Sequence, residues 1–212
     1  MQYMRSDMAD WSTVISNPSW FVKDAGDNYV FNSYWGTYLM NISNVGWQQH
    51  YIDTVNALSG YSGIFVDDVW YDITGYLGGF NATVPASYVS SFNSYMDSAL
   101  SHFGTEINGI VLINSDEFET DTYLSITGID GQMLEGFMHP NWASYSYYSS
   151  FYAGAGEDLY RKSALGKIVW CASGVDSTNT TEINNILTWS YNSFVANSTN
   201  LANSYFSFGS NL

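Results

Sequence analysis

Two short apolar segments of this 212-residue chain end in carboxylates. The run Gly63-Ile64-Phe65-Val66 leads into the adjacent pair Asp67 and Asp68, and residues 131–134 lead into Glu135. A short apolar run that begins at a glycine is typical of a buried parallel strand. In a barrel of alternating strands and helices, acidic residues at the carboxyl ends of strands lie where the chemistry is done. Two such carboxylates are the minimal equipment for cleaving a glycosidic bond.

The two adjacent aspartates are expected to differ in role. Neighbouring residues of a regular strand point to opposite faces, so Phe65 and Asp67 share one face while Val66 and Asp68 share the other. Only one carboxylate of the pair can then point into the mouth of a barrel. The other is expected to support it or the substrate. A structural alternative stays open, in which the pair only caps the junction between strand and loop.

Glu135 stands in an apolar stretch, between Leu134 and Phe137. We therefore expect a carboxyl group removed from water, as a general acid requires; the alternative is a glutamate bonded to a loop amide. The carboxyl groups of a retaining glycosidase lie about 5–5.5 Å apart, and those of an inverting enzyme about 6.5–9.5 Å. The sequence does not give that separation.

Further polar and aromatic residues near predicted strand ends are candidates for contact with a sugar. Amide and carboxylate groups can bond sugar hydroxyls, although in loops they equally often make turns. Flat aromatic rings suit the apolar side of a sugar ring, and 18% of the chain is aromatic. A histidine opens the loop that follows Glu135. The residues predicted to bind substrate are Asp68, Trp70, Asn114, Asp116, His139, Trp170 and Trp35.

Strand-like and helical segments alternate along the chain, which is typical of an α/β fold. The predicted strands are residues 36–42, 63–69, 107–114, 129–137, 167–172 and 204–208. Helical periodicity is clearest at Val89, Phe92, Met96, Leu100 and Phe103, with Gly104 as the predicted stop.

The pattern predicts a (β/α)8 TIM-type barrel formed by a single domain, residues 1–212. A complete barrel needs about 250 residues, so this chain of about six strands is short by one or two strand–helix units, and its N-terminus looks helical. We expect the first two strands to be missing, leaving edges that a partner chain or a missing N-terminal segment would cover. A compact six-stranded variant is the alternative.

The ordered segments resemble a family of hypothetical glycoside-hydrolase-like (β/α)8 barrels, distantly related to the α-amylase and α-galactosidase types. The resemblance spans roughly residues 11–208. Its matching pieces are the segments 20–26, 39–44, 63–69, 111–114 and 130–135, of which Gly63-Ile64-Phe65-Val66-Asp67-Asp68-Val69 matches best. The resemblance implies that Asp67 is the nucleophile of a retaining mechanism and that Glu135 is the general acid/base.

Composition excludes several partners. The chain has 5 Lys and Arg against 20 Asp and Glu, a formal charge of −15, which argues against nucleic acid and against anionic membrane surfaces. No apolar run approaches the roughly 20 residues of a membrane span. Charged residues make up only 12% of this acidic protein, so neutral polar groups must keep it in solution. We take this as a sign of a secreted or cell-surface protein, which four N-glycosylation-type sequons, at Asn41, Asn81, Asn179 and Asn197, support weakly.

The sequence predicts neither a metal nor a cofactor. Its three histidines lack the spacing of metal ligands, and no phosphate-binding glycine loop is present. The single cysteine, Cys171, is expected to be a buried, inert thiol. Two functions remain: a glycoside hydrolase, or a non-catalytic carbohydrate-binding or structural protein on a degenerate barrel. An aldolase-type barrel is disfavoured because Lys167 lies at the start of a strand.

Overall fold

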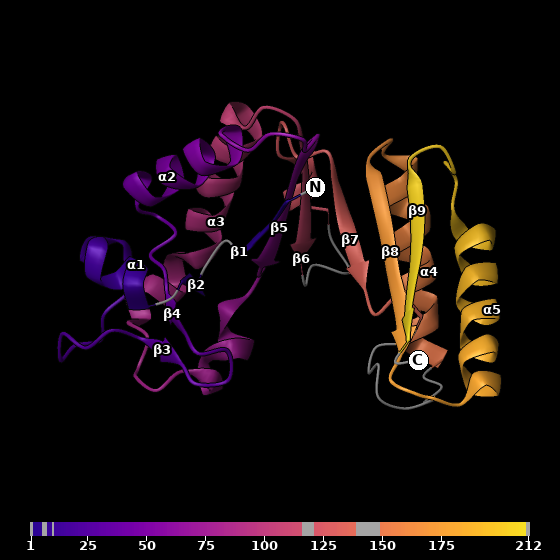
Figure 1. Cartoon of the computed structure of the whole chain (residues 1–212), viewed down its shortest axis with the longest axis horizontal. Helices are drawn as coiled ribbons and strands as arrows, with labels where there is room; N and C mark the ends of the chain where they lie inside the picture. The colour runs from indigo at the N-terminus through magenta and orange to yellow at the C-terminus, as the bar shows by residue number, and fades with distance from the viewer. Residues whose placement is uncertain (1, 6–7, 10, 116–120, 139–148, 211–212) are drawn as a thin grey trace. The chain divides into compact units, whose positions relative to one another are not determined.

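The computed structural model describes residues 2–210 apart from 6–7, 10, 116–120 and 139–148 (Figure 1). The chain divides into two compact units. The first comprises Met1–Asp116 and Ser125–Ile129, and the second Glu117–Leu124 and Asp130–Leu212. Each unit has parallel strands with connecting helices, so the predicted α/β class is confirmed.

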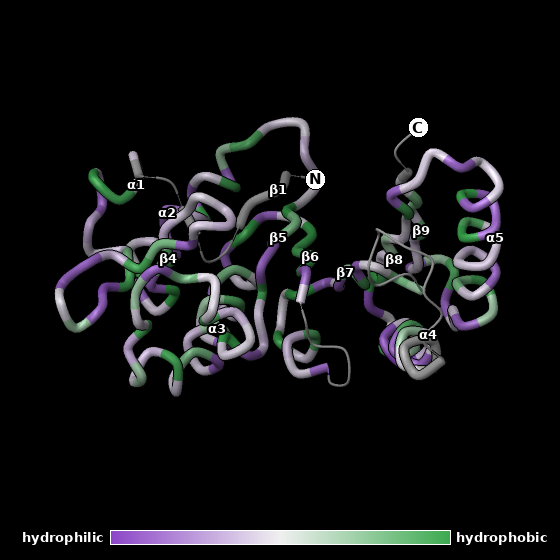
Figure 2. Tube along the Cα trace, turned by 90° about the horizontal axis from the view of Figure 1, so that it is seen from below, coloured by the Kyte–Doolittle hydropathy of each residue, from purple (hydrophilic) through white to green (hydrophobic). Residues whose placement is uncertain are grey.

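The first unit is built on three parallel strands in the order β1-β5-β6: β1 (Gln2–Arg5), β5 (Gly63–Val69) and β6 (Ile110–Ser115). The helices α2 (Val45–Asn56) and α3 (Ala86–Glu106) pack together, and the 3-10 helix η2 (Ile73–Gly79) lies between β5 and α3. Ile64, Val66, Val111 and Ile113 are fully buried. The trace of β6 is accordingly coloured as largely hydrophobic in Figure 2.

A small antiparallel sheet follows β1. Its strands, in the order β2-β4-β3, are β2 (Met8–Ala9), β4 (Thr37–Leu39) and β3 (Phe31–Asn32). The short helices α1 (Trp11–Ser16) and η1 (Pro18–Trp20) lie between β2 and β3. The strand predicted at 36–42 therefore exists, but it belongs to this antiparallel sheet and not to the parallel one.

The prediction that the chain begins in a helix is wrong. Residues 2–5 form β1, which pairs in parallel with β5 through Gln2 opposite Ile64 and Arg5 opposite Asp67. Four residues are too few to show a periodicity, so only the partner strand reveals this element.

The second unit repeats the parallel arrangement in the order β7-β8-β9, with β7 (Gly131–Glu135), β8 (Ile168–Val175) and β9 (Ser204–Ser210). The 3-10 helix η3 (Tyr123–Ser125) precedes β7. The helices α4 (Ser149–Ala164) and α5 (Thr180–Asn197) pack against β8 and against each other (Figure 2). Leu134, Leu159, Val169, Cys171 and Phe194 form the core.

Helix α3 does not stop at Gly104 but continues to Glu106. Gly104 is required for a different reason, since a Cβ at this position would lie 2.4 Å from the carbonyl oxygen of Thr127. The buried face includes Tyr88, whose hydroxyl donates to the carbonyl of Met40 at 2.8 Å. Closure of the strands into a barrel stays a prediction.

Among the described residues, no helix is both long enough and apolar enough to cross a membrane.

Candidate functional site

Asp67 and Asn114 are held together at the carboxyl ends of neighbouring strands. The side-chain amide of Asn114 in β6 donates a hydrogen bond of 2.8 Å to Oδ1 of Asp67 in β5. Both residues are half-buried. A hydrogen bond to a carboxylate is stronger than one between neutral groups, so Asn114 fixes the orientation of the Asp67 carboxylate. The structure thus unites two residues that the sequence singled out 47 positions apart.

β5 is irregular at the aspartate pair. The pairing of β5 with β6 shifts between Val66 and Val69, and Asp68 has a φ of +56°. Aspartate tolerates this left-handed conformation better than most residues other than glycine. The alternation of faces assumed for a regular strand therefore does not hold across Asp67 and Asp68. Such bulges are frequent beside active sites, where they re-aim a side chain.

Trp70, just beyond the end of β5, is a packing residue in this structure. It is only 5% exposed, and its ring stacks on Tyr76 with centroids 4.2 Å apart. Phe92 of α3 packs near it, with ring centroids 6.4 Å apart. Its contact with a substrate stays a prediction.

Trp35 lies in the turn between β3 and β4, and not at the end of a parallel strand. It is 56% exposed, beside Tyr34, which is 80% exposed. The side-chain oxygen of Asn32 accepts hydrogen bonds from the backbone N–H groups of both residues, at 3.0 and 3.2 Å. These bonds fix the turn, which presents two aromatic rings to solvent.

In the second unit, Glu135 is the last residue of β7 and is paired in register with Ala172 of β8. The sequence predicted a desolvated carboxyl group, but Glu135 is exposed while Leu134 and Phe137 are buried. The chain turns directly after it, at Gly136 with a φ of +65°. Both faces of β7 are buried up to Leu134, so Glu135 is exposed at the point where the strand ends and the chain turns.

β8 runs further than predicted. Trp170 was predicted to lie near a strand end, but it is the third of the eight residues of β8. Its indole N–H donates to Ser207 Oγ in β9 at 2.8 Å. The residue that follows the carboxyl end of β8 is Asp176, which is exposed and which sequence analysis missed. Ser173 and Gly174 interrupted the apolar run, although Val175-Asp176 repeats the pattern of Val66-Asp67.

A partly buried group of four charged side chains lies near the end of α4. Arg161 bonds to both Asp121 and Asp158, and Lys162 Nζ lies 3.1 Å from Asp121 Oδ1. The Lys162 side chain is 0% exposed and that of Asp158 is 4% exposed. Burial raises the pKa of Asp158 to about 6 against the attraction of Lys162 and Arg161. Burial also acts to raise the pKa of Asp121, but the hydrogen bonds from Arg161 and Lys162 outweigh it, so that pKa lies below its usual range.

Two predicted contacts, Asp116 and His139, lie outside the described residues. Within the part of the chain that is described, no three His, Cys, Asp or Glu side chains are grouped to hold a metal ion. Cys171 is fully buried, and burial raises the pKa of its thiol. The expectation of a buried thiol is confirmed.

No protein-family model matches this chain, and no curated protein matches it. Eight chains among solved structures do match. One is the glycoside hydrolase domain of PelA from Pseudomonas aeruginosa, with 13% sequence identity and a TM-score of 0.62. The alignment covers 97% of this chain and 76% of that chain. The fold is therefore like that of a glycoside hydrolase domain.

Proposed function

We propose that this protein is a glycoside hydrolase that cleaves a poly- or oligosaccharide. The observation that carries the proposal is the Asp67 carboxylate, oriented by Asn114 at the carboxyl ends of β5 and β6. Loops and strand ends on that side of a parallel sheet are where (β/α)-barrel enzymes carry their chemistry. The likeness in fold to a glycoside hydrolase domain supports the same class of reaction.

Asp67 is the proposed nucleophile of a retaining mechanism. One of its oxygens forms a bond to the anomeric carbon as the bond to the leaving oxygen breaks, and an acid protonates that oxygen. Water then hydrolyses the glycosyl–enzyme ester, and the same acid, now a base, accepts the proton of that water. Asn114 keeps the attacking carboxylate oriented through both steps.

Glu135 is the proposed acid/base, because it is the last residue of the parallel strand β7, and Asp67 lies close to the carboxyl end of β5. Asp176 is its competitor, since it follows the end of β8, the strand beside β7. Both carboxylates are exposed. Mutagenesis distinguishes the two candidates. Loss of the true acid/base slows the hydrolysis of substrates with poor leaving groups far more than that of activated aryl glycosides, because the leaving group of an activated glycoside needs no proton.

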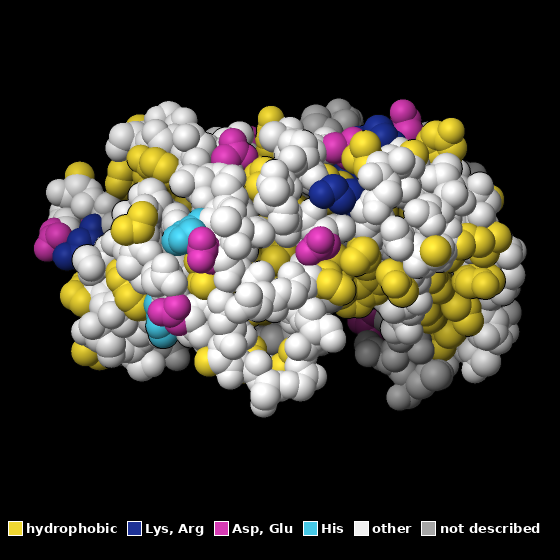
Figure 3. All heavy atoms as spheres, turned by 90° about the horizontal axis from the view of Figure 1, so that it is seen from above, with side chains coloured by type: hydrophobic (Ala, Val, Ile, Leu, Met, Phe, Trp, Pro, Cys, Tyr) yellow, Lys and Arg dark blue, Asp and Glu magenta, His cyan; other side chains and the backbone are white. Residues whose placement is uncertain are grey.

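A secreted or cell-surface location is part of the proposal. Figure 3 shows a face made mainly of uncharged atoms, with few Lys and Arg side chains. Neutral polar groups of this kind change little in charge with pH, which suits a protein outside the cell. A partner chain that completes a barrel belongs to the same proposal.

The test is hydrolysis of aryl α- and β-glycosides and natural polysaccharides by the wild type and by Asp67→Asn, Glu135→Gln and Asp176→Asn. Asp67→Asn should lose at least about 10³-fold in kcat, and azide should restore turnover with inversion at the anomeric carbon. Asp53→Asn changes an exposed carboxylate on α2 and is the matched control. Full activity of Asp67→Asn would refute the assignment.

A non-catalytic carbohydrate-binding protein is the second candidate. The exposed rings of Tyr34 and Trp35 favour it, because a rigid turn that presents aromatic faces to water suits sugar binding without chemistry. Sugar binding without turnover of any substrate would select this function.

A further inference from the structure

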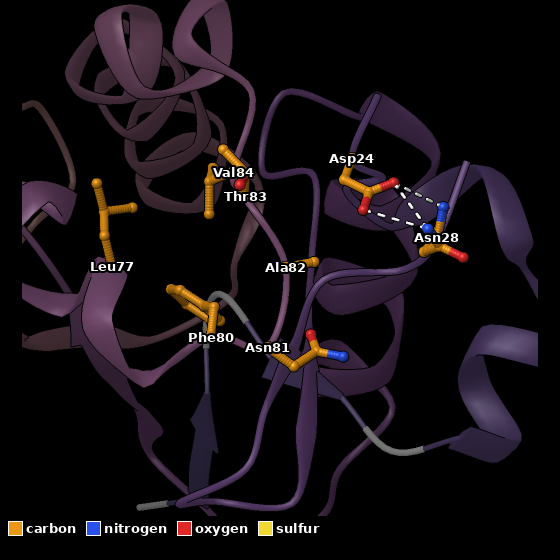
Figure 4. Close-up of a pocket in the computed structure, with 8 residues that line it drawn as sticks. All are labelled: Asp24, Asn28, Leu77, Phe80, Asn81, Ala82, Thr83 and Val84. Carbon is orange, nitrogen blue, oxygen red and sulfur yellow. Dashed lines mark hydrogen bonds between the residues drawn. The ribbon is translucent and has the colours of Figure 1, made fainter. Parts of the chain in front are cut away.

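We infer that an open groove in the first unit is a glycan-binding subsite that does not include the reacting carboxylate. The inference extends the proposed function, because it takes a carbohydrate as the ligand. The groove lies between the turn at Asp24–Asn28 and the segment 77–84, and Asp67 is not among its lining residues (Figure 4).

The groove is placed and sized for a ligand. Its volume is about 760 Å³, within the range of about 300–1,000 Å³ that is usual for small-molecule sites. The turn belongs to the connection that follows β1, and the segment 77–84 belongs to the connection that follows β5. Connections after the carboxyl ends of parallel strands form the substrate-binding side of α/β enzymes.

The lining combines neutral polar groups with apolar ones. Asn28, Asn81 and Thr83 contribute amides and a hydroxyl, while Leu77 and Phe80 contribute partly exposed apolar surface. Sugar rings need both kinds, since they carry hydroxyls at their edge and C–H groups on their faces. None of the eight lining residues is basic, so the groove is unsuited to phosphate, nucleotides or anionic polymers.

The one carboxylate of the groove is already occupied. Asp24 Oδ1 accepts hydrogen bonds from the backbone N–H of Gly26 at 2.8 Å and of Asn28 at 2.9 Å. The side-chain amide of Asn28 also donates to both oxygens of this carboxylate, at 3.2 Å each (Figure 4). Asp24 and the side-chain NH2 of Asn28 therefore shape the wall together. The groups proposed to select the ligand are the side-chain oxygen of Asn28, the side-chain NH2 of Asn81 and the hydroxyl of Thr83.

The opposite wall is fixed before any ligand arrives. Asn81 donates its backbone N–H to the carbonyl of Phe31 at 2.8 Å, and its side-chain oxygen accepts from the Phe31 N–H at 2.7 Å. Phe80 forms an isolated antiparallel bridge with Asn32. A wall held in this way loses little conformational freedom on binding, which favours affinity.

The same contacts join the groove to the exposed aromatic turn. Asn32 bonds the backbone of Tyr34 and Trp35 on one side and pairs with Phe80 on the other. We expect these rings to continue the glycan-binding surface beyond the groove. Trp35 is more exposed than Trp70 and Trp170, the other two tryptophans predicted to bind substrate.

The test uses affinity electrophoresis of the full chain through gels that each contain starch, a neutral β-glucan, xylan or galactomannan. Ala82→Trp fills the groove with a side chain, and Ala57→Trp makes the same change at the exposed C-terminal end of α2. All variants are produced in a bacterial host that leaves the sequon at Asn81 without a glycan. Thr83→Ala then removes only a hydroxyl, and because this change is small it tests the groove even if the larger variant does not fold. Circular dichroism checks that each variant is folded.

We expect Ala82→Trp to lower the affinity for one of these polysaccharides at least tenfold and Thr83→Ala to lower it about threefold, with Ala57→Trp unchanged. Turnover of aryl glycosides should be the same in all three. Wild-type retardation that Ala82→Trp preserves would overturn the inference, as would a wild type that none of the four polysaccharides retards. Retardation that Ala82→Trp abolishes, together with no turnover of any substrate, would refute the proposed hydrolase activity but support the glycan-binding subsite.

Discussion

Replacing Asp158 by asparagine should change how the stability of the protein depends on pH. Asp158 lies in α4, with its side chain 4% exposed, and its charged neighbours are Arg161, Lys162 and Asp121. Its Oδ2 atom is buried without a hydrogen-bond partner among the described residues. The two basic neighbours therefore compensate the burial of this carboxylate only in part, and its pKa is raised from 3.8 to about 6.

The sign and size of the effect follow from that pKa. In the unfolded chain Asp158 ionises near pH 3.8, whereas in the folded protein it keeps its proton until about pH 6. Between these values the folded state binds more protons, so its stability falls as the pH rises, and above pH 6 the loss is constant. A difference of about 2 in pKa, at about 1.4 kcal/mol per unit, gives a loss of at most about 3 kcal/mol.

Asparagine has nearly the same shape but does not ionise, so Asp158→Asn should lack this pH-dependent loss. The free energy of unfolding is measured by urea titration at intervals from pH 3.5 to pH 7.5 for both proteins. The difference in free energy of unfolding, Asp158→Asn minus wild type, should rise by about 3 kcal/mol from pH 3.5 to pH 7.5. This rise is expected even if the substitution also changes stability by an amount that does not depend on pH.

Glu157→Gln makes the same chemical change at the exposed neighbouring residue and serves as the control. Its difference from the wild type should stay within about 0.5 kcal/mol over the whole range, as is usual for surface substitutions. A difference between Asp158→Asn and the wild type that does not vary with pH would show that Asp158 is not desolvated in the folded protein.

Three other substitutions or modifications test the structure directly. Gly104→Ala should destabilise the fold by about 1–3 kcal/mol, because the new Cβ would lie 2.4 Å from the Thr127 carbonyl oxygen; urea unfolding measures this, and unchanged stability would contradict the close approach. Cys171 should resist iodoacetamide in the native protein and react once unfolded, since burial raises the pKa of its thiol; mass spectrometry follows the adduct, and fast native labelling would contradict the burial. Asn114→Ala should lower kcat about 10–100-fold through the lost hydrogen bond to Asp67, with Asn93→Ala on the exposed face of α3 as the control.

The local sequence was sufficient to locate the buried parallel strands, because the residue types of these segments show that they are buried. The apolar runs that became β5, β6, β7 and β8 were located by residue type, because a buried strand must be apolar on both faces. The position of Asp67 after such a run, and of Asn114 after the next, also followed from the sequence. The sequence could predict only that these two side chains lie close together, because adjacent parallel strands end at the same edge of a sheet. It could not predict their hydrogen bond.

Other features were decided by contacts between distant segments. β1 exists because it pairs with β5, and residues 37–39 joined an antiparallel sheet because β2 and β3 flank them. Gly104 resembled a helix stop, yet its role is set by the backbone of Thr127, which no local pattern contains.

The sequence by itself determined the α/β class, the carboxylates near strand ends and the large excess of acidic over basic residues, because these depend on residue type and order. Only the tertiary structure decided that β5 bulges at Asp68, that Glu135 is exposed, that Trp70 is buried, and that Asp158 shares a buried ion cluster with Lys162. Each of these features depends on which distant segment of the chain packs against the residue. Burial, strand register and pKa are set by neighbours in space, and the sequence determines those neighbours only through the complete fold.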